Sequence, residues 1–452
     1  MGRLFGTDGV RGVANADLTP ELAFAIGRAA AAVIARDAAR AGAIVVGRDT
    51  RLSGTMLEAA IVAGITSTGR DVVRVGVLPT PGVAYLTART NAAAGVMISA
   101  SHNPVGDNGI KFFGPDGFKL SDATEDEIEA HLNDPSLPRP THVGVGIVRD
   151  DPGAGAAYAR SLVAAGRSLA GLTVVLDAAY GAAYAVGPAV FAELGAHVIA
   201  LHAVDDGSRI NVECGTLHLG RLAARVKEEA AKAHGPVVGV AFDGDADRAL
   251  FVDERGTILN GDHVMLVLAH ALHATGELTG DTVVGTVMSN VGLERALARD
   301  GITLVRTAVG DRYVLEAMRA GGFRLGGEQS GHIIDLARNT TGDGPLTAVL
   351  VFSLVASSGR SLHELAAQLT VYPQVLVNVR VGDTFAYDAS AAVRAQIAHA
   401  RAVLGADGRI LVRSSGTEPL VRVMIEGQDL AAIELLAEAI AETIRLAANT
   451  SL

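Results

Sequence analysis

The chain has 452 residues, which at roughly 100 to 200 residues per domain predicts three or four domains. Charged residues interrupt every apolar stretch before it reaches the roughly 20 residues of a membrane span, so we expect no membrane-spanning helix. The formal net charge of -11 argues against nucleic acid or an anionic membrane as the main partner, and an anionic substrate would have to meet local clusters of cations.

The first residues and the cysteine content both predict a cytoplasmic protein. Residues 1–8 read MGRLFGTD and contain no apolar segment of the kind that forms a secretory signal. Cys214 is the single cysteine, which excludes an intramolecular disulfide and a cluster of thiolate ligands and fits a reducing compartment. We expect Cys214 to be a small buried hydrophobic residue.

Valine-rich runs of strand length alternate with alanine-rich helical stretches along most of the chain, which is typical of β-α-β units around a largely parallel sheet. Three strand-and-loop units look alike and recur at domain-sized intervals, at residues 44–49, 173–178 and 282–287. We therefore predict an α/β protein with three similar α/β domains, each built on a mixed, largely parallel sheet.

Breaks in this pattern predict the domain boundaries. Residues 133–140 carry three prolines and residues 357–360 form a short polar break, so we expect linkers near 140–155 and 360–372. The last segment has alternating strands and an amphipathic helix, which predicts a smaller C-terminal α+β domain. The predicted domains span residues 1–150, 151–256, 257–368 and 369–452.

A glycine-bounded loop, GVMISASHNPVGDNGIK at residues 95–111, combines a hydroxyl, a histidine and a cation. Residues 96–98 read as the end of a buried strand and Asn103-Pro104 forces a turn, so Ser101 should lie at a strand's carboxyl end, where α/β enzymes bind ligands. A phosphorylated serine there could donate its phosphoryl group, whereas a lone hydroxyl could equally stabilise a turn.

Three carboxylates alternate in a second loop, FDGDADR at residues 242–248, between two apolar runs. Asp243, Asp245 and Asp247 stand at i, i+2 and i+4 of an extended loop and point the same way, so they would repel one another without a cation. Oxygen ligands without histidine or cysteine favour Mg²⁺. The alternative is a solvated acidic turn.

A calcium-binding EF-hand also fits part of this spacing. Asp243, Asp245, Asp247 and Glu254 fall at loop positions 1, 3, 5 and 12 of that motif. Position 6 requires glycine but holds Arg248, and the flanking residues read as strands rather than helices. We therefore reject the EF-hand.

Three further segments have the composition of a sugar phosphate site. RSSGTEP at residues 413–419, followed by Arg422, combines a glycine turn, hydroxyls and arginines, the groups of an anion clamp, although hairpin turns use similar residues. GGEQSGH at residues 326–332 offers Glu328 and Ser330 to sugar hydroxyls. FGTDGVRG at residues 5–12 presents an arginine from a tight turn.

Together these five segments closely resemble the signature loops of the α-D-phosphohexomutase superfamily, from residue 5 to residue 422. In that family a loop like TASHNP carries a phosphoserine, DGDxDR binds the metal, GExSGH binds the sugar and RxSGTEP binds phosphate. This chain has SASHNP at residues 99–104 and keeps the other three loops. The family folds as three similar α/β domains and a divergent fourth, in agreement with the repeat described above.

The resemblance implies a role for each matching residue. Ser101 is the phosphorylated residue, and an oxygen of its phosphate completes the Mg²⁺ shell formed by Asp243, Asp245 and Asp247. Lys111 and Arg11 are candidates for polarising or deprotonating the attacking hydroxyl, and His332 is a second acid or base. His102 fixes the loop, and Arg248 supplies a cation for the transferring group. The sugar ligands are Glu328 and Ser330, and the ligands of the phosphate that does not react are Arg413, Ser415, Gly416, Thr417 and Arg422.

Within the superfamily, FGTDGVRG, GEQSGH and RSSGTEP resemble the bacterial branch that converts glucosamine 6-phosphate into glucosamine 1-phosphate, on the route to UDP-N-acetylglucosamine and the cell wall. Relatives that act on glucose and mannose phosphates tend to read YDIRG, GEMSGH and RPSGTEP. The implied enzyme is an isomerase that works through the phosphoserine and a hexose 1,6-bisphosphate, which is both intermediate and activator.

Other functions stay open at this point. Nothing in the sequence identifies the group that recognises the C2 amine, so phosphoglucomutase or phosphomannomutase activity is compatible with the loops. A Mg²⁺-dependent sugar phosphatase usually relies on an aspartate nucleophile, and a non-catalytic sensor would lose Ser101 or the aspartates. The expected partner is a small sugar phosphate, without nucleic acid or membrane, and the number of assembling chains is left open, with a homodimer as one arrangement.

Overall fold

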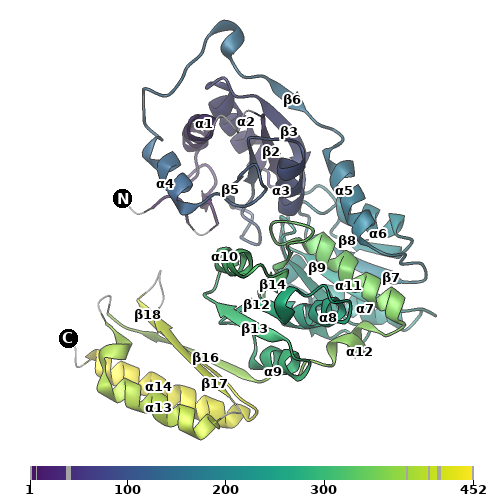
Figure 1. Cartoon of the computed structure of the whole chain (residues 1–452), viewed down its shortest axis with the longest axis vertical. Helices are drawn as coiled ribbons and strands as arrows, with labels where there is room; N and C mark the ends of the chain where they lie inside the picture. The colour runs from purple at the N-terminus through teal and green to yellow at the C-terminus, as the bar shows by residue number, and fades with distance from the viewer. Residues whose placement is uncertain are drawn as a thin grey trace. The chain divides into compact units, whose positions relative to one another are not determined.

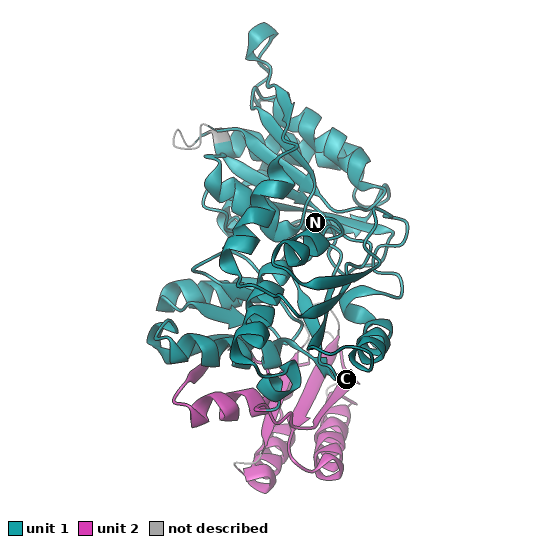
Figure 2. Ribbon diagram, turned by 90° about the vertical axis from the view of Figure 1, so that its right-hand side faces the viewer, with its two compact units in different colours: residues 1–286, 305–367 teal, residues 287–304, 368–452 magenta. Residues whose placement is uncertain are grey.

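The computed structural model describes residues 3–6, 8–36, 42–382, 385–405, 408–414 and 419–449. Contacts within the chain divide it into two compact units, which Figure 2 colours separately. Unit 1 comprises residues 1–286 and 305–367, and unit 2 comprises residues 287–304 and 368–452. Among the described helices, none combines the length and the apolarity that crossing a membrane requires.

A six-stranded mixed sheet organises the first part of unit 1, in the order β1-β5-β4-β2-β3-β6. Its apolar strand residues and the buried face of α1 form one continuous core. The elements are β1 (Val10–Val13), α1 (Pro20–Ala35), β2 (Ile44–Arg48), α2 (Gly54–Thr66), β3 (Val72–Val77), α3 (Thr80–Arg89), β4 (Ala94–Ile98), β5 (Asp107–Phe113), α4 (Asp122–Ala130), η1 (His142–Gly144) and β6 (Val148–Asp150).

A five-stranded sheet follows, in the order β11-β10-β9-β7-β8. Its central strand β9 is buried at every position, as expected for a strand covered on both faces. The elements are α5 (Ala154–Ala165), β7 (Thr173–Asp177), α6 (Val186–Glu193), β8 (His197–Leu201), η2 (Gly215–Leu217), α7 (Gly220–Ala230), β9 (Val237–Phe242), β10 (Ala249–Val252) and β11 (Ile258–Leu259).

The third sheet has four strands in the order β13-β12-β14-β15. Helix α9 and the first residues of β13 belong to unit 2, and the rest of this region belongs to unit 1. The elements are α8 (Gly261–Ala274), η3 (Thr279–Asp281), β12 (Thr282–Thr286), α9 (Val291–Arg299), β13 (Thr303–Thr307), α10 (Asp311–Gly321), β14 (Leu325–Gly327), β15 (Ile333–Asp335), α11 (Gly344–Ser358) and α12 (Leu362–Ala366).

The three sheets share one topology, which confirms the predicted repeat. The valine-rich strands β2, β7 and β12 pair in parallel with β4, β9 and β14. Each of those strands then reverses into an antiparallel partner, β5, β10 or β15. Three connections therefore occupy the same place in three sheets, and they are the predicted phosphoserine, metal and sugar loops. Figure 1 labels the valine-rich strands β2, β7 and β12 of the three sheets.

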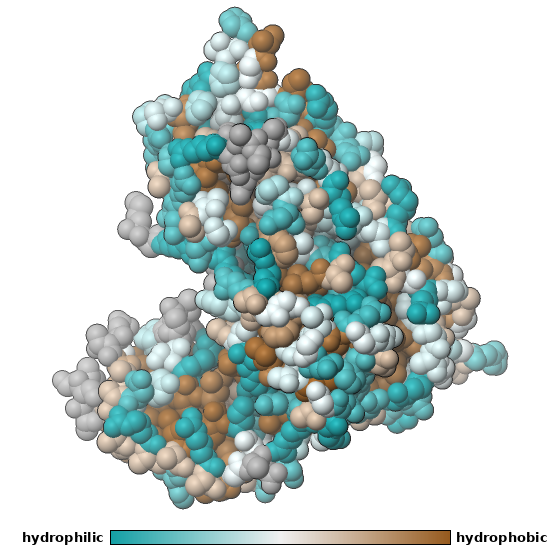
Figure 3. Space-filling model, viewed as in Figure 1, coloured by the Kyte–Doolittle hydropathy of each residue, from teal (hydrophilic) through white to brown (hydrophobic). Residues whose placement is uncertain are grey.

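The C-terminal part of unit 2 is a three-stranded antiparallel sheet, in the order β16-β18-β17, whose core is shared with two helices. This is the predicted small α+β arrangement. On the face drawn in Figure 3, one cluster of hydrophobic surface residues lies over this part of the chain. The elements are β16 (Gln374–Arg380), η4 (Tyr387–Ala389), α13 (Ala391–Leu404), β17 (Arg409–Ser414), β18 (Leu420–Glu426) and α14 (Leu430–Asn449).

Two segments that the sequence suggested as linkers contain regular structure. Strand β6 pairs in parallel with β3, and helix α12 lies within the predicted 360–372 linker. Helix α12 begins with a capping box, in which Ser361 and Glu364 each accept a hydrogen bond from the other's backbone amide. The linker predictions were wrong there because they rested on the prolines of residues 133–140 and the polar break at residues 357–360, which lie just before these two elements. The domain boundaries at residues 150, 256 and 368 stay predictions.

Candidate active site

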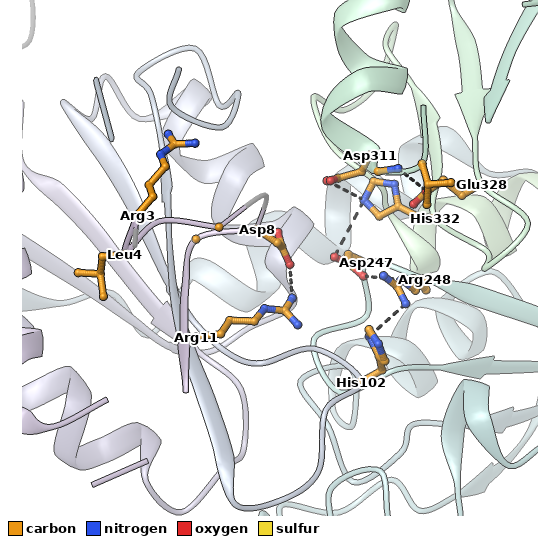
Figure 4. A pocket seen from close by; sticks show the side chains of 14 residues that line it. Arg3, Leu4, Asp8, Arg11, His102, Asp247, Arg248, Asp311, Glu328 and His332 are labelled. Carbon is orange, nitrogen blue, oxygen red and sulfur yellow. Dashed lines mark hydrogen bonds and ion pairs between the residues drawn. The ribbon is translucent and has the colours of Figure 1, made fainter. Parts of the chain in front are cut away.

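A cleft of about 440 Å³ opens in unit 1, and charged side chains of both signs are among the residues that line it. Figure 4 shows Arg3, Asp8 and Arg11 on one side of it and Asp247, Arg248, Asp311, Glu328 and His332 on the other. The volume suits a monosaccharide phosphate, and the mixture of cations and carboxylates suits a ligand with both phosphates and hydroxyls. The lining residues are Arg3, Leu4, Gly6, Asp8, Gly9, Arg11, His102, Asp247, Arg248, Val309, Gly310, Asp311, Glu328 and His332.

Ser101 lies in the connection between β4 and β5, directly after the buried strand, as predicted. Its side-chain hydroxyl donates to Asp243 Oδ2 over 2.5 Å, and its backbone amide donates to Ser99 Oγ over 2.9 Å. Its φ of 51° places it in the left-handed region, which is unusual for a residue other than glycine. Ser101 is 1% exposed, and the adjacent His102 lines the cleft.

The three aspartates of the loop between β9 and β10 converge as predicted. One oxygen of each of Asp243, Asp245 and Asp247 lies within 4.8 Å of the others, and all three residues are buried. Burial and repulsion from Asp247 and Asp245 raise the pKa of Asp243 well above its usual range. Burial alone would raise the pKa of Asp245 as well, but Lys111 and a hydrogen bond from Thr80 outweigh it and lower that pKa.

This loop fits a divalent metal ion. Among the described residues, no hydrogen-bond donor reaches Asp245 Oδ1 or Asp247 Oδ1, although both atoms are buried. Buried carboxylate oxygens without a donor are costly unless a cation binds them, and three oxygen donors match the preference of a hard divalent cation. Strands β9 and β10 flank the loop, so the EF-hand is excluded.

Lys111 and Arg11 both reach this region from neighbouring strands. Lys111 lies on β5, with its Nζ 3.0 Å from Asp245 Oδ2 and 3.1 Å from Asp8 Oδ2. Burial would lower the pKa of Lys111, but the carboxylates around it outweigh burial and raise that pKa. Arg11 lies on β1, where its guanidinium pairs with Asp8 and donates to Asn103 Oδ1 over 3.2 Å.

His102 accepts rather than donates at the edge of the cleft. Its Nδ1 lies 3.0 Å from Arg248 Nη1 and 3.3 Å from Ser101 Oγ. Burial, followed by the charges of Arg248 and Arg11, lowers the pKa of His102 to about 4. The imidazole is therefore neutral at neutral pH, and its Nδ1 accepts a hydrogen bond from the Arg248 guanidinium, which fits the role in fixing the loop that the sequence predicts.

The connection between β14 and β15 contributes two lining residues. Glu328 Oε1 accepts from the backbone amide of Gly310 over 3.1 Å. His332 is 2% exposed, and its Nε2 lies 3.6 Å from Asp311 Oδ2 and 4.0 Å from Asp247 Oδ2. Among the described residues, none forms a hydrogen bond with either ring nitrogen of His332. Ser330 is exposed and does not line the cleft.

Several charged residues of this site were not predicted. Lys119 Nζ lies 2.5 Å from Asp8 Oδ1 and 2.5 Å from Asp311 Oδ2, so it links the first sheet to the start of α10. Thr80, at the start of α3, donates to Asp245 Oδ2 over 2.6 Å. Asp8 lies in the FGTDGVRG segment, which was singled out in the sequence because of Arg11. No motif contains Lys119, Asp311 or Thr80. Their roles depend on partners far away in the sequence.

Unit 2 carries the predicted phosphate loop. Arg413 on β17 and Arg422 on β18 are directly opposite each other in the sheet register. Burial lowers the pKa of Arg413, and the charge of Arg422 lowers it further. Two guanidinium groups at facing positions of a sheet can bind one anion together through charge-assisted hydrogen bonds, so this pair suits a phosphate. The predicted ligands Ser415, Gly416 and Thr417 lie outside the described residues.

Sequence models of four domains match the chain. All four belong to the phosphoglucomutase/phosphomannomutase family: α/β/α domain I at residues 2–138, α/β/α domain II at 156–256, α/β/α domain III at 260–372 and the C-terminal domain at 376–443. The matches cover the whole length over which the sequence resembled the superfamily.

Close relatives and solved structures agree with these matches. Phosphoglucosamine mutase from Symbiobacterium thermophilum is 54% identical over 98% of this chain and 99% of its own length, and the one from Moorella thermoacetica is 55% identical over 96% and 97%. A phosphoglucomutase/phosphomannomutase family protein from Burkholderia thailandensis superposes with a TM-score of 0.81 at 24% identity, over 98% of this chain and 97% of its own.

A second solved structure shares the fold at lower similarity. N-acetylphosphoglucosamine mutase from Aspergillus fumigatus, in complex with GlcNAc-6P and magnesium, superposes with a TM-score of 0.66 at 20% identity, over 98% of this chain and 96% of its own. The domain matches and the full-length relatives establish the relationship. The chain belongs to the phosphoglucomutase/phosphomannomutase family, and within that family to the phosphoglucosamine mutases.

Proposed function

We propose that this enzyme interconverts glucosamine 6-phosphate and glucosamine 1-phosphate through a phosphoserine at Ser101 and a 1,6-bisphosphate intermediate. The observation that carries the proposal is the 2.5 Å hydrogen bond from Ser101 Oγ to Asp243 Oδ2. It joins the hydroxyl of one signature loop to a buried carboxylate of another, beside a cleft lined by arginines.

In the first step, phospho-Ser101 would transfer its phosphoryl group to O1 of the bound 6-phosphate sugar. The bond from phosphorus to Ser101 Oγ breaks and a bond from phosphorus to O1 forms, while the O1 hydroxyl loses its proton and Ser101 Oγ gains one. The bisphosphate then turns end for end, so that its 6-phosphate faces Ser101. The bond from phosphorus to O6 breaks as Ser101 Oγ takes that phosphoryl group and loses its proton, O6 gains a proton, and the 1-phosphate sugar leaves. One site thus serves both half-reactions.

A divalent cation held by Asp243, Asp245 and Asp247, which we expect to be Mg²⁺, would neutralise charge on the transferring phosphoryl oxygens. Arg248 and Lys111 would supply further positive charge where that group passes. Because Lys111 stays protonated between its carboxylate partners, it suits polarising the attacking hydroxyl better than deprotonating it. His332 is the better proton acceptor, since its ring nitrogens form no hydrogen bond with other described residues.

Recognition of the rest of the substrate would fall to two groups of residues. Glu328 lines the cleft and would accept hydrogen bonds from sugar hydroxyls. Arg413 and Arg422, on neighbouring strands of unit 2, would bind the phosphate that does not react, together with Ser415, Gly416 and Thr417. The reduced state expected of the single cysteine suits a cytoplasmic enzyme.

The test is ³¹P NMR of the purified enzyme with Mg²⁺, a trace of glucose 1,6-bisphosphate and glucosamine 6-phosphate, with glucose and mannose 6-phosphates in parallel samples. We expect glucosamine 1-phosphate to form faster than the other 1-phosphates, and Ser101→Ala to abolish its formation. Growth of inorganic phosphate instead would identify a phosphatase. Faster conversion of glucose or mannose phosphate would identify a phosphoglucomutase or phosphomannomutase, and activity in Ser101→Ala would exclude the phosphoserine.

A further inference from the structure

The backbone of the Ser101 loop is held from two sides at the same two carbonyl groups. The Ser101 carbonyl accepts from Arg51 Nη2 over 3.0 Å and from Asn211 Nδ2 over 2.8 Å. The Asn103 carbonyl accepts from the same two nitrogens, over 2.8 Å and 3.2 Å. These four contacts fix the Ser101–His102 and Asn103–Pro104 peptide groups, at and next to the proposed nucleophile.

Arg51 belongs to the same sheet as the loop and forms part of its internal framework. Its side chain is fully buried, pairs with Asp49 and donates to the carbonyls of Pro104 and Asp107. Asn211 is different because it comes from the second sheet's region of the chain, more than a hundred residues away in sequence. Asn211 therefore contacts the Ser101 loop from a different sheet's region of the chain.

The backbone around Asn211 is built to present its side chain. Asn211 has a φ of 60°, and its amide donates to the Ala179 carbonyl over 3.1 Å. The Asp177 carboxylate joins the two segments, because it accepts from the amides of Ala179 and Gly215. Asparagine tolerates left-handed backbone, but Ala179, also left-handed at 53°, does not do so readily. Strain of this kind persists where the surrounding structure fixes a functional geometry.

The same segment also holds the metal loop. The amide of Ala182 donates to the Gly244 carbonyl over 2.8 Å, between Asp243 and Asp245. Gly181 approaches so closely that a Cβ at that position would lie 2.3 Å from the Gly244 carbonyl oxygen. One framework, residues 177–182 with Asn211, therefore contacts both the nucleophile loop and the loop of the metal-binding carboxylates.

We propose that Asn211 is a positioning residue, which holds Ser101 in its left-handed backbone conformation and thereby sets the direction of Oγ relative to Asp243. The inference rests on the proposed function, in which Ser101 carries the phosphoryl group. Asn211 does not touch the substrate or the reacting atoms. It acts through the Ser101 and Asn103 carbonyls, and its loss lets the loop relax away from the in-line arrangement that phosphoryl transfer requires.

Two substitutions separate this role from general stability. Asn211→Gly keeps a residue that adopts left-handed backbone and removes the side chain. Asn211→Asp keeps the size and the backbone preference but replaces the donor with a carboxylate that faces two carbonyl oxygens. Ser361→Ala is the matched control, since it removes a helix cap from α12 and costs stability without touching either loop.

The first measurement is the rate at which glucose 1,6-bisphosphate phosphorylates Ser101 in single-turnover mass spectrometry. The second is kcat and KM for glucosamine 6-phosphate. We expect both Asn211 variants to lower the phosphorylation rate and kcat by about 10- to 100-fold. KM should stay within about twofold, the mark of an interaction that matters in the transition state. Ser361→Ala should lower the melting temperature while leaving kcat near that of the unchanged enzyme.

Other outcomes overturn the inference. Rates within about twofold of the unchanged enzyme in a folded Asn211→Asp or Asn211→Gly would remove Asn211 from catalysis. If the Asn211 variants and Ser361→Ala lose equal stability and also lose equal kcat, the role of Asn211 is in folding rather than in catalysis. If the unchanged enzyme itself takes up no phosphoryl group at Ser101, the proposed function fails instead, and this control distinguishes the two failures.

Discussion

Lys111 shows how the site balances buried charge at the level of one residue. Its ammonium group is 2% exposed and lies within 3.1 Å of carboxylate oxygens of Asp245 and Asp8. A buried cation in such a place is stabilised by its partners, and its partners are stabilised by it. The arrangement keeps a fixed positive charge beside two carboxylates of the proposed metal site, Asp245 and Asp247, where it would offset the negative charge of a transferring phosphoryl group.

Replacing Lys111 by methionine should therefore lower kcat by about 100- to 1,000-fold, the range typical of one preorganised charge. Lys111→Arg keeps the charge and should retain about tenfold more activity than the methionine variant. Steady-state kinetics with glucosamine 6-phosphate check this, alongside circular dichroism melts, because unpaired Asp8 and Asp245 destabilise the fold. Equal activity of the two variants would contradict a role based on charge.

A second residue-scale prediction concerns Asp343, which caps α11 away from the cleft. Burial raises the pKa of Asp343 from its ordinary 3.8 to about 6, although hydrogen bonds from Leu346, Tyr158 and Asn339 lower it. The folded state thus binds the proton more tightly than the unfolded chain does. The stabilisation from that proton is present below about pH 4 and is lost as the pH rises through about 6.

Tyr158→Phe should therefore destabilise the protein more at about pH 7.5 than at about pH 5. The Tyr158 hydroxyl donates to Asp343 Oδ1 over 2.7 Å, and its removal costs about 1.5 to 3 kcal/mol when the acceptor is ionised and about 1 kcal/mol when it is neutral. Thermal midpoints at the two pH values measure the difference. Tyr85→Phe, a neighbouring tyrosine, is the control, and equal losses at both pH values would show that Asp343 does not titrate in this window.

Residues of the site could be predicted where a motif carries them and not otherwise. Ser101 and the three aspartates stand out because hydroxyls and like charges beside apolar strands are unusual in any sequence. Lys119 and Asn211 look ordinary, since each works through a partner that only the folded chain brings near. A motif can also suggest a residue that the structure does not bring to the cleft. Ser330 was predicted as a sugar ligand from its motif, but it is exposed and does not line the cleft.

At the scale of elements, the three signature loops of unit 1 are the same connection in three copies of one sheet. Each follows a strand parallel to the valine-rich strand and precedes its antiparallel neighbour. The carboxyl ends of parallel strands are where α/β proteins bind ligands, so each sheet contributes one loop. The proposed nucleophile, the proposed metal-binding carboxylates and the proposed sugar ligand thus come from equivalent places on three sheets.

The middle loop should depend on metal for stability as well as for activity. Mg²⁺ should raise the thermal midpoint of the unchanged enzyme, because it relieves repulsion among Asp243, Asp245 and Asp247 and binds the folded state. EDTA should abolish mutase activity and added Mg²⁺ should restore it. Asp245→Asn should remove most of the thermal shift, whereas Asp253→Asn, another buried aspartate of the same sheet, should keep it. A shift that survives in Asp245→Asn would place the metal elsewhere.

Elements could be predicted from the sequence where periodicity is strong. The valine-rich strands β2, β7 and β12 and the C-terminal helix α14 follow directly from their patterns. Strand β6 escaped prediction because its three residues are exposed at a sheet edge and show no alternation. Helix α12 escaped because five residues are too few for a helical period, although its capping box was readable.

At the scale of the whole molecule, the net charge of -11 coexists with local groups of arginines. Arg3, Arg11 and Arg248 line the cleft, and Arg413 faces Arg422 across two strands of unit 2. Local concentration of arginine, rather than overall charge, would account for the bisphosphate binding that we propose. A bisphosphate that turns end for end needs a second phosphate site that accepts either end, and the arginine pair of unit 2 is our candidate for it.

Arg413→Ala should weaken binding of glucosamine 6-phosphate and glucosamine 1-phosphate alike. In the active enzyme the reaction's equilibrium constant forces kcat/KM to fall equally in both directions, so kinetics alone cannot separate the two ligands. Dissociation constants measured by calorimetry in a Ser101→Ala background are independent of each other. We expect both to rise by about tenfold or more, the cost of a hydrogen bond to a charged group.

Arg445→Ala is the control for this prediction, since that arginine pairs with Glu438 and Glu442 on the surface of α14. It should leave both dissociation constants unchanged. A rise for only one ligand would mean that Arg413 binds one end of the sugar and that the bisphosphate does not reuse this site after turning. No rise for either would remove the arginine pair from recognition and leave the three sheets of unit 1 to bind both phosphates.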